Sequence, residues 1–405
     1  MRTDGAVPGN TVVFDSFDLA LLTHPMPPIQ GLVCPFAINP PNPPKVFTET
    51  MPHVPDNTND ILRTGIETTM GREIAEIETL KSSGRQSSSI RFTRVTFVDQ
   101  DTVHVWAKTL HGAQDSTIKQ ARTARDFDLH TLLHAAFQAQ GRFRVPRPIF
   151  HSPEERLIVT EHCDGYRLQD KIERLARGFP RSESIRELLQ DCGRAGQWLR
   201  AFQSATRDHA PGVAGGFDAQ KLKDLPRIVE QTSTRIEELL GRSPIALGNL
   251  KRDDVLAFLH DRLARIDPRE APSCSIHGDF FPGNLLVGSD YVCGIDFSSA
   301  TWGTPWFDLS YCVFQLETLA IKPWFRKRTL SALIDAFLEG FGSHLRHRDF
   351  WYATPEMEIL HVSHCIARLL ALSKHAQEKG PRALYRKHLM RGSIKTLSSH
   401  IQRQV

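Results

Sequence analysis

The stretch from Ser275 to Ser298, SIHGDFFPGNLLVGSDYVCGIDFS, gathers the residues of this sequence that are best suited to chemistry. Asn284 precedes one apolar run and Asp296 follows a second, and Gly288-Ser289-Asp290 between the runs is a turn signal. If the two runs pair as a hairpin, Asn284 and Asp296 converge at its open end. Asp279 lies on the loop that enters the hairpin, five residues before Asn284.

These three side chains suit phosphoryl transfer assisted by magnesium. Mg²⁺ prefers carboxylate and amide oxygens together with water and substrate phosphate, and Asp296 and Asn284 offer one oxygen ligand of each kind. A separate carboxylate, here that of Asp279, can orient a hydroxyl group and accept its proton. A loop of Asp, Gly and Asn is often only a turn. The whole spaced set, however, arises by chance in about one chain in ten thousand at average residue frequencies, which favours a functional interpretation.

The same residues carry a family resemblance. His277-Gly278-Asp279 with Asn284, followed by Ile295-Asp296-Phe297, resembles the signature of the aminoglycoside phosphotransferase and choline kinase superfamily, whose members have a protein-kinase-like fold. The later segment Thr304-Pro305-Trp306-Phe307-Asp308-Leu309 is similar to the Pro-x-x-Asp-Leu stretch of that family. The resemblance covers about residues 84–376.

The resemblance implies a role for each matching residue. Asp279 would be the catalytic base that orients the acceptor hydroxyl, and Asn284 and Asp296 would be the magnesium ligands. His277 would brace the catalytic loop, and Asp308 is similar to an aspartate that ties down the backbone of that loop.

A cation for the nucleotide phosphates is expected upstream. Lys108 ends the alternating segment at 102–108 and precedes a predicted helix at 118–138. A lysine at a strand end is by itself usually just solvated, but the resemblance implies that Lys108 holds the α and β phosphates. Its partner would be an acid of the next helix. The spacing favours Asp126 over Asp128, where the family normally has Glu, although both aspartates are also compatible with a solvated face.

Two further segments complete the ATP site that the resemblance implies. The segment at 160–165 resembles the hinge between the lobes, and the backbone from Glu161 to Cys163 would meet the adenine. Ser82 to Ser89 stands where a glycine-rich loop normally covers the phosphates. Backbone amides and serine hydroxyls can donate to phosphate, although a serine-rich segment is also typical of a flexible connector.

The elements that must position these residues follow from the hydrophobic patterns. Alternation at 90–98 and 102–108 predicts a β-hairpin, and 157–160 predicts another short strand. After Gly165 helical patterns dominate, at 183–206, 218–241, 250–266, 306–320, 326–342, 355–376 and 381–402. We therefore predict an α+β, two-lobed, kinase-like fold. Its small β-rich, nucleotide-binding N-terminal lobe spans 84–164, and its helical C-terminal lobe with the catalytic loop and acceptor site spans 165–405.

An N-terminal extension at 1–83 precedes these lobes. Ten prolines lie between Pro25 and Pro55. Proline fixes its own backbone and restricts its predecessor, so no regular element is expected there. Residues 57–81 are predicted to form a helix that ends near Ser82-Ser83-Gly84.

Composition limits the class of protein. With 405 residues, 40% hydrophobic and 24% charged, the chain fits a soluble globular protein of more than one subdomain. A formal charge of +4 is near balance, so no nucleic-acid partner is expected. Seven scattered cysteines without a CxxC pair favour a reducing cytoplasm over a disulfide framework. The sequence shows neither a signal peptide nor an apolar run long enough for a transmembrane helix.

The sequence thus predicts a kinase that uses ATP and Mg²⁺ to phosphorylate a hydroxyl group of a small molecule. Between Glu183 and Glu270, 14 acidic residues are balanced by 14 basic ones. This segment therefore lacks the acidic excess that would indicate a polycationic aminoglycoside as the acceptor. A sugar, an amino alcohol or a glycolipid headgroup remains open as the acceptor. The basic stretch at 374–403 mildly favours a neutral or anionic acceptor, and is otherwise more typical of a solvated helix than of a contact with an anionic surface.

Two rival interpretations come from other classes. One is a catalytically weak, kinase-like protein that binds ATP and regulates; the missing glycine-rich loop and Asp126 in place of Glu motivate it. The other is a protein kinase. Gly278, where protein kinases carry Arg, argues against this second rival.

Overall fold

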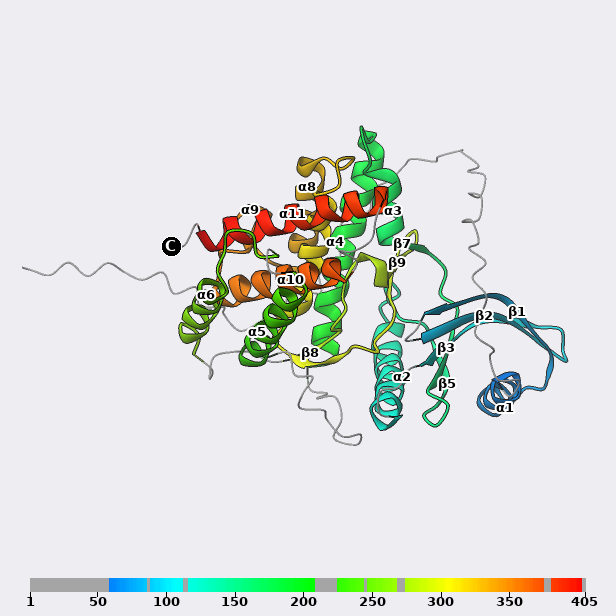
Figure 1. Ribbon diagram of the computed structural model, residues 1–405. Coiled ribbons are helices and arrows are strands. Elements are labelled where there is room, and N and C mark those ends of the chain that lie inside the picture. The colour runs from blue at the N-terminus through cyan, green and yellow to red at the C-terminus, as the bar shows by residue number, and fades with distance from the viewer. Residues whose placement is uncertain are drawn as a thin grey trace, which may run out of the picture. The chain divides into compact units, whose positions relative to one another are not determined.

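The structure is a computed structural model that describes residues 58–85, 88–111, 116–207, 224–243, 246–267, 274–374 and 380–402. Every described element belongs to one compact unit, Met51–Val405. The proline-rich segment at 25–55 lies outside the described residues. A β-sheet lobe is followed by a helical part, so the predicted α+β, kinase-like architecture is confirmed (Figure 1).

The sheet of the N-terminal lobe has five antiparallel strands in the order β1-β2-β3-β6-β5. They are β1 (Ile74–Arg85), β2 (Ser88–Phe97), β3 (Thr102–Leu110), β5 (Pro148–Ser152) and β6 (Leu157–Glu161). The predicted hairpin is β2–β3, with Ile90 opposite Lys108 and Thr96 opposite Thr102. The expected strand at 157–160 is β6.

The predicted helix at 57–81 is wrong in its second half. Helix α1 spans only Thr58–Met70, and Gly71 ends it in the left-handed conformation, at a φ of 64°. The chain then enters β1 at Ile74, so the sheet begins before the expected boundary at residue 84. Pairing with β2 outweighs the helical propensity of this segment, because strand formation is decided by cross-strand neighbours more than by local preference.

The serine-rich segment also differs from expectation. Residues 82–85 and 88–89 lie in the paired strands β1 and β2, with Gly84 opposite Ser89, rather than in a loop. Only residues 86 and 87 join the strands, and they lie outside the described residues. The phosphate-covering role of this segment therefore stays a prediction.

One face of the sheet is covered by α1. Leu62 and Ile66 of this helix pack against a buried cluster that includes Val95, Phe97 and Val105. Because side chains alternate along a strand, Val105 and Ala107 point into this core, and Lys108 points to the opposite face. Helix α2 (Ser116–Gln138) follows β3 and lies beside the sheet (Figure 1).

The C-terminal part is helical. The predicted helices are confirmed as α4 (Ser182–Ala205), α5 (Leu225–Arg242), α6 (Arg252–Ala264), α7 (Trp306–Leu319), α8 (Lys327–Phe341), α10 (Pro355–Ser373) and α11 (Pro381–Gln402). The short helices α3 (Leu168–Leu175) and α9 (His347–Phe350) are additions. None of the described helices combines the length and apolarity that crossing a bilayer requires.

Short strands frame the loop that the sequence predicts to be catalytic. The predicted hairpin is β9 (Leu285–Val287) with β10 (Val292–Gly294), and β4 (Phe143–Arg144) and β7 (Tyr166–Arg167) flank it in a four-stranded sheet. Upstream, β8 (Cys274–Ile276) pairs with β11 (Thr301–Gly303). The segment predicted to be catalytic therefore runs between two strand pairs.

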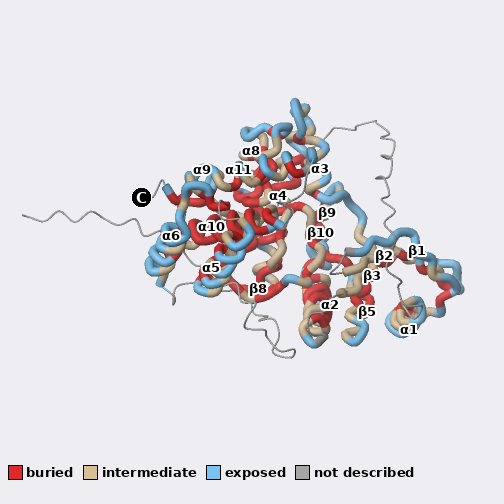
Figure 2. Tube along the Cα trace, in the orientation of Figure 1, coloured by how far each residue is buried: buried red, intermediate tan, exposed pale blue. Residues whose placement is uncertain are grey.

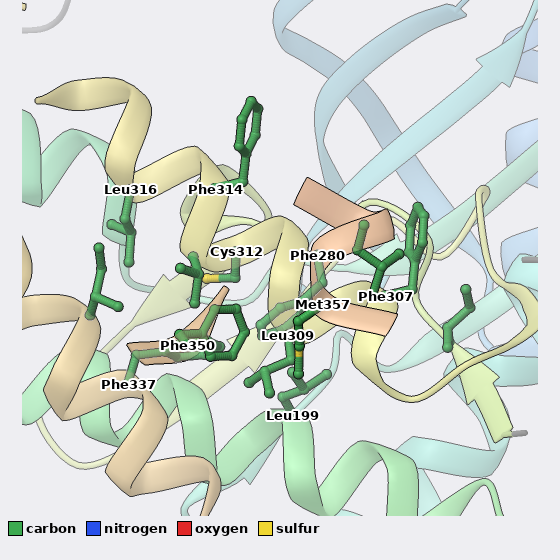
Figure 3. Close-up of a cluster of buried hydrophobic side chains, with 14 of the residues drawn as sticks. Leu199, Phe280, Phe307, Leu309, Cys312, Phe314, Leu316, Phe337, Phe350 and Met357 are labelled. Atoms are coloured by element: carbon green, nitrogen blue, oxygen red, sulfur yellow. The ribbon is translucent and has the colours of Figure 1, made fainter. Parts of the chain in front are cut away.

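A continuous apolar core supports these strands. Figure 2 shows buried segments running through α4, α10 and the hairpin region. In the close-up of Figure 3, Leu199 of α4, Leu309 of α7 and Phe337 of α8 belong to one cluster with Phe280, which immediately follows Asp279. The segment predicted to be catalytic is thus anchored in the main buried cluster of the molecule.

Candidate active site

The backbone of the predicted catalytic loop is held by Asp308. Its Oδ2 accepts a hydrogen bond from the backbone N–H of His277 at 2.6 Å, and its Oδ1 accepts one from Gly278 at 2.9 Å. Gly278 has a φ of 78°, and a Cβ at this position would lie 2.2 Å from the carbonyl oxygen of Ser299. Only glycine fits this turn, so Asp308 and Gly278 together set the direction in which the chain reaches Asp279.

Two aromatic side chains anchor the same loop. Phe280 is fully buried and stacks on Trp198 of α4, with ring centroids 5.8 Å apart. His277 is also fully buried, and its Nε2 lies 3.1 Å from the carbonyl oxygen of Ile295, to which it donates as the neutral tautomer. Burial lowers the pKa of His277, which keeps this ring neutral. His277 therefore braces the loop, as the resemblance implied.

Asp279 lies on this loop and interacts with Tyr311 of α7. The side-chain amide of Asn284 donates to its backbone oxygen at 2.9 Å and to its Oδ2 at 3.1 Å, and the hydroxyl of Tyr311 interacts with its carboxylate. Burial, reinforced by repulsion from Asp296, raises the pKa of Asp279 to about 6. A half-buried carboxylate with this pKa is suited to accept a proton near neutral pH.

Asn284 and Asp296 are brought together by the β9–β10 hairpin. Leu285 lies opposite Gly294, and the N–H of Ile295 donates to the carbonyl of Asn284 at 3.0 Å. The convergence expected from the spacing is therefore present in the structure. Because the amide nitrogen of Asn284 bonds to Asp279, its amide oxygen is the ligand atom that it can offer.

Asp296 contacts the lysine of the other lobe. Its Oδ1 accepts hydrogen bonds from Lys108 Nζ at 2.5 Å and from Ser298 Oγ at 2.7 Å. Partial burial opposes ionisation, but attraction to Lys108 and these hydrogen bonds outweigh it, so the pKa of Asp296 falls below its usual value. Asp296 has a φ of 67°, a conformation rarely adopted outside glycine. Such local strain persists where the surroundings enforce it.

Asp126 connects α2 to this centre. Its Oδ2 lies 3.6 Å from Lys108 Nζ, and its Oδ1 accepts a hydrogen bond from the N–H of Phe297 at 3.1 Å. His130 Nδ1 lies 3.1 Å from the same carboxylate. Despite its shorter side chain, Asp126 therefore reaches both the lysine and the backbone that follows Asp296. Burial lowers the pKa of Lys108, but Asp126 and Asp296 raise it by more, so the lysine stays charged.

The two predicted hinge residues lie at the lobe boundary. Glu161 ends β6; its N–H donates to the carbonyl of Arg147 at 2.8 Å, and its carboxylate pairs with Arg147 Nε at 3.0 Å. The Cys163 thiol is partly buried and interacts with Cys293 of β10. The side chain of Glu161 is therefore engaged within the sheet lobe. The contact of this backbone with a nucleotide base stays a prediction.

Two residues near these side chains, Trp106 and Tyr311, were missed from the sequence. Trp106 lies two residues before Lys108 and so shares its face of β3; its Nε1–H donates to His162 Nδ1 at 2.9 Å, and its ring stacks on Phe92 at 4.7 Å. The alternation of the strand could have identified it. Tyr311 lies one helical turn after Asp308 on α7. The motif marks where this helix begins, but it does not show which face of the helix is exposed.

Comparison with known proteins was consistent with this geometry. A sequence model described as the phosphotransferase enzyme family matches residues 106–351, more than half of the chain. No curated protein matches the sequence. Among solved structures, wild-type aminoglycoside 2'-phosphotransferase-IIIa in its GDP complex is 13% identical with a TM-score of 0.50, over 84% of this chain and 99% of that chain.

Two other similar structures have lower TM-scores. A macrolide 2'-phosphotransferase from Brachybacterium faecium is 14% identical with a TM-score of 0.46, over 84% of this chain and 98% of that one. A choline/ethanolamine kinase family protein from Mesorhizobium loti is 14% identical with a TM-score of 0.44, over 85% of this chain and 98% of that one. At these identities, structural similarity concerns the fold alone.

Proposed function

Because the chain belongs to the phosphotransferase enzyme family, as its motif predicted, we propose that it transfers the γ-phosphate of ATP to a hydroxyl group of a small molecule, assisted by Mg²⁺. Family membership supports a kinase-type enzyme that acts on small molecules; the nucleotide, the metal and the alcohol acceptor are the finer parts of the proposal. The observation that carries it is that the β9–β10 hairpin brings together two contacts, that of Lys108 with Asp296 and that of Asn284 with Asp279.

The residues present fit a magnesium ion. Asp296 offers an ionised carboxylate, and Asn284 offers an amide oxygen oriented by its bond to Asp279. Among the described residues, no group of three His, Cys, Asp or Glu side chains could hold a metal. A two-ligand site is what Mg²⁺ uses when water and phosphate complete its shell. When bound, the ion neutralises charge on the β and γ phosphates.

In the proposed reaction the protein contributes mainly position and charge. Asp279 accepts the hydrogen bond of the acceptor hydroxyl and aligns its oxygen with the γ-phosphorus. The new O–P bond forms as the bond to the β-γ bridging oxygen breaks, ADP leaves, and the hydroxyl proton passes to Asp279 and then to water. Lys108 holds the nucleotide phosphates, and Asp126 holds Lys108.

The alternative hypothesis, a catalytically weak ATP-binding protein, rested on two observations, and one of them no longer supports it. The Asp126 substitution does not separate the helix from Lys108, since the side-chain atoms lie 3.6 Å apart.

The six cysteines of the described residues are free thiols, which supports the proposal that the enzyme acts in the reducing cytoplasm.

An ATP-consumption screen over hydroxylated small molecules tests this proposal. We expect Mg²⁺-dependent ADP release in the presence of one acceptor class, and mass spectrometry should show one added phosphoryl group on that acceptor. Asp279→Ala should abolish transfer while largely sparing ATP binding, whereas Asp296→Ala should also weaken Mg²⁺-dependent ATP binding. Near-normal activity of both variants would end the proposal.

A further inference from the structure

Two largely exposed segments of the helical part are strongly basic. Residues 174–181 (RLARGFPR) lead from α3 to α4, and residues 322–328 (KPWFRKR) lead from α7 to α8. Together they hold seven Lys or Arg and no Asp or Glu, although the whole chain is close to charge balance. Arg177 and Phe325 pair in an antiparallel β-bridge, so the two basic segments lie side by side.

Most of these cations are not neutralised. Lys322 pairs with Glu173 at 3.0 Å. The other six are exposed and have no carboxylate within salt-bridge distance in the described part of the chain: Arg174, Arg177, Arg181, Arg326, Lys327 and Arg328. Arg72 of the sheet lobe, by contrast, pairs with both Asp99 and Asp101. A face with uncompensated positive charge attracts an anionic partner.

Aromatic side chains are interleaved with the arginines. The guanidinium of Arg326 lies over the ring of Phe179, 3.9 Å from its centroid. That of Arg177 lies 5.2 Å from the centroid of the Trp324 ring. Trp324 also stacks on Tyr385, with ring centroids 5.9 Å apart, near the beginning of α11 and beside α3 (Figure 1). We call the surface formed by these side chains the arginine–aromatic face; its residues are Arg174, Arg177, Phe179, Trp324, Arg326 and Tyr385.

Exposed apolar side chains gather at this face. Six large hydrophobic side chains are exposed among the described residues, and four of them lie in or next to the face: Tyr166, Phe179, Trp324 and Leu384. Tyr166 joins it because the guanidinium of Arg174 lies 5.6 Å from its ring centroid. Phe179 is 87% exposed and Leu384 is 69% exposed. Apolar side chains concentrated on one part of a surface indicate an interaction site.

This combination fits the surface of a bilayer better than it fits nucleic acid. At a bilayer surface, Arg and Lys reach lipid phosphates while aromatic and aliphatic side chains enter the boundary of the acyl chains. Nucleic-acid bases would stack on open aromatic rings. Here Arg326 already lies over Phe179, and Trp324 is already stacked on Tyr385. The aliphatic Leu384 offers a base nothing to stack on.

We propose that the arginine–aromatic face docks on a membrane surface rich in anionic phospholipids. Phe179 enters the boundary of the hydrocarbon, and the six exposed cations of the two basic segments face the lipid phosphates. The contact therefore comes mainly from residues 174–181 and 322–328 rather than from the basic stretch at 374–403. This inference does not rest on the proposed phosphotransferase function.

Binding of the full chain to lipid vesicles tests the proposal. We expect co-sedimentation with vesicles of phosphatidylcholine that contain about 30% phosphatidylserine, and affinity at least about tenfold lower for vesicles of phosphatidylcholine alone. Raising the salt from about 0.1 to 0.5 M should weaken the binding, because salt screens exposed charges. Equal affinity for the two kinds of vesicle, or no binding to either, would overturn the proposal.

The double variant Arg177→Gln, Arg326→Gln tests the charges. Each Lys or Arg near an anionic surface contributes about fivefold in affinity, so we expect binding to weaken by about 25-fold. Arg391→Gln with Lys395→Gln removes the same charge from exposed positions later on α11 and should change binding by less than about threefold. An equal loss in both double variants would show that net charge, not this face, attracts the vesicles.

Phe179→Ser tests the apolar contact. We expect about tenfold weaker binding at both salt concentrations, because the loss is hydrophobic and salt does not screen it. Val98→Ser, which removes a 54% exposed apolar side chain between β2 and β3, should leave binding unchanged. Unchanged binding of Phe179→Ser would contradict insertion of this ring.

A charge-conserving variant and a competing ligand complete the test. Arg177→Lys with Arg326→Lys should bind vesicles within about threefold of the wild type, and it keeps the test decisive should the Gln variant fold poorly, which its Tm would reveal. If a single-stranded RNA oligonucleotide displaced the protein from the vesicles at lower concentration than free anionic lipid, the face would be a nucleic-acid site and the proposal would be wrong.

Discussion

Asp279, Asp296 and Asp308 are the same residue type in three different electrostatic environments. Asp296 is held ionised by Lys108, so its pKa lies below the usual value. Burial raises the pKa of Asp279 to about 6 and that of Asp308 to about 7, although two backbone amides favour the charged form of Asp308. These environments suit Asp296 as a metal ligand, Asp279 as a base and Asp308 as a backbone anchor.

The environment of Asp279 predicts a trade between activity and stability. Its pKa of about 6 in the folded protein lies above the ordinary aspartate value of 3.8, so the folded protein binds this proton more tightly than the unfolded chain. Stability contributed by the group is therefore present below about pH 4 and is lost as pH rises to about 6. Asp279→Asn should slow transfer by about 10²–10⁴-fold, yet stabilise the metal-free protein by about 1–3 kcal/mol near pH 8 and by nothing near pH 4.

Denaturant unfolding of the two proteins without divalent cations checks this expectation. A structural role for Asp279 predicts the opposite sign, a variant that is less stable than the wild type near pH 8. That outcome would remove the reason for regarding this carboxylate as functional.

Asp126 should act through Lys108 and Phe297 rather than on substrate. Asp126→Asn keeps an acceptor for the N–H of Phe297 but removes the charge that holds Lys108. We expect KM for MgATP to rise by about tenfold, with a smaller change in kcat, in steady-state assays. Asp128→Asn is the matched control, because Asp128 is exposed on the same helix. Equal effects of the two substitutions would contradict the assignment.

The site residues that the sequence revealed were those whose spacing reflects local geometry. Asn284 and Asp296 could be placed because a hairpin forces its ends together. Tyr311 could not, since its position near Asp279 depends on how α7 packs against the loop, and packing leaves no local pattern in the sequence.

At the level of elements, the loop between β8 and β9 depends on one glycine. The φ of 78° and the 2.2 Å approach to Ser299 at Gly278 both exclude a side chain. Gly141 has a similar φ of 68°, but a Cβ added there would meet nothing within 4 Å. A substitution at Gly141 therefore has the backbone cost of a positive φ without the steric clash. This pair allows the backbone cost and the steric cost to be measured independently.

Gly141→Ala should destabilise the protein by about 1 kcal/mol, the cost of the backbone conformation alone. Gly278→Ala should cost more than about 3 kcal/mol and reduce kcat by at least about tenfold, because the clash displaces the loop that carries Asp279. Unfolding by urea and initial-rate assays measure both. Equal costs for the two variants would show that the approach to Ser299 is relieved without displacing the loop.

Most long, strongly patterned elements were predictable from the sequence, whereas short ones were predictable only where a motif marked them, as in the β9–β10 hairpin. The C-terminal helices were recognised because each carries several turns of apolar periodicity. Strands β4, β7, β8 and β11 have two or three residues each, too few to show a period. Strand β1 was taken for helix because its pairing with β2 is a non-local interaction.

For the whole molecule, the fold class followed from a 24-residue motif (residues 275–298) more than from composition, because the family that this motif resembles has a lysine-bearing sheet opposite it. The structure places Lys108 of the sheet lobe against Asp296 of the helical part at 2.5 Å. Nucleotide bound at this junction would contact both parts of the molecule. Binding should therefore stabilise the molecule as a whole.

Thermal unfolding with ATP tests this coupling. ATP with Mg²⁺ should raise Tm by more than ATP with a chelator, since a ligand at about 100 times its Kd adds about 2.7 kcal/mol of stability. In Asp296→Asn the difference between the two conditions should vanish. A Mg²⁺-independent shift in the wild type would favour the rival in which the protein only binds the nucleotide.

Phosphoryl transfer through Asp279 is tested by following the γ-phosphate of labelled ATP to the best acceptor, at saturating MgATP, in wild type and Asp279→Asn side by side. We expect labelled acceptor from the wild type and a rate lower by about 10²–10⁴-fold in the variant, with unchanged affinity for MgATP. Label transferred at similar rates by both proteins would show that Asp279 is not the base and that the proposed mechanism is wrong.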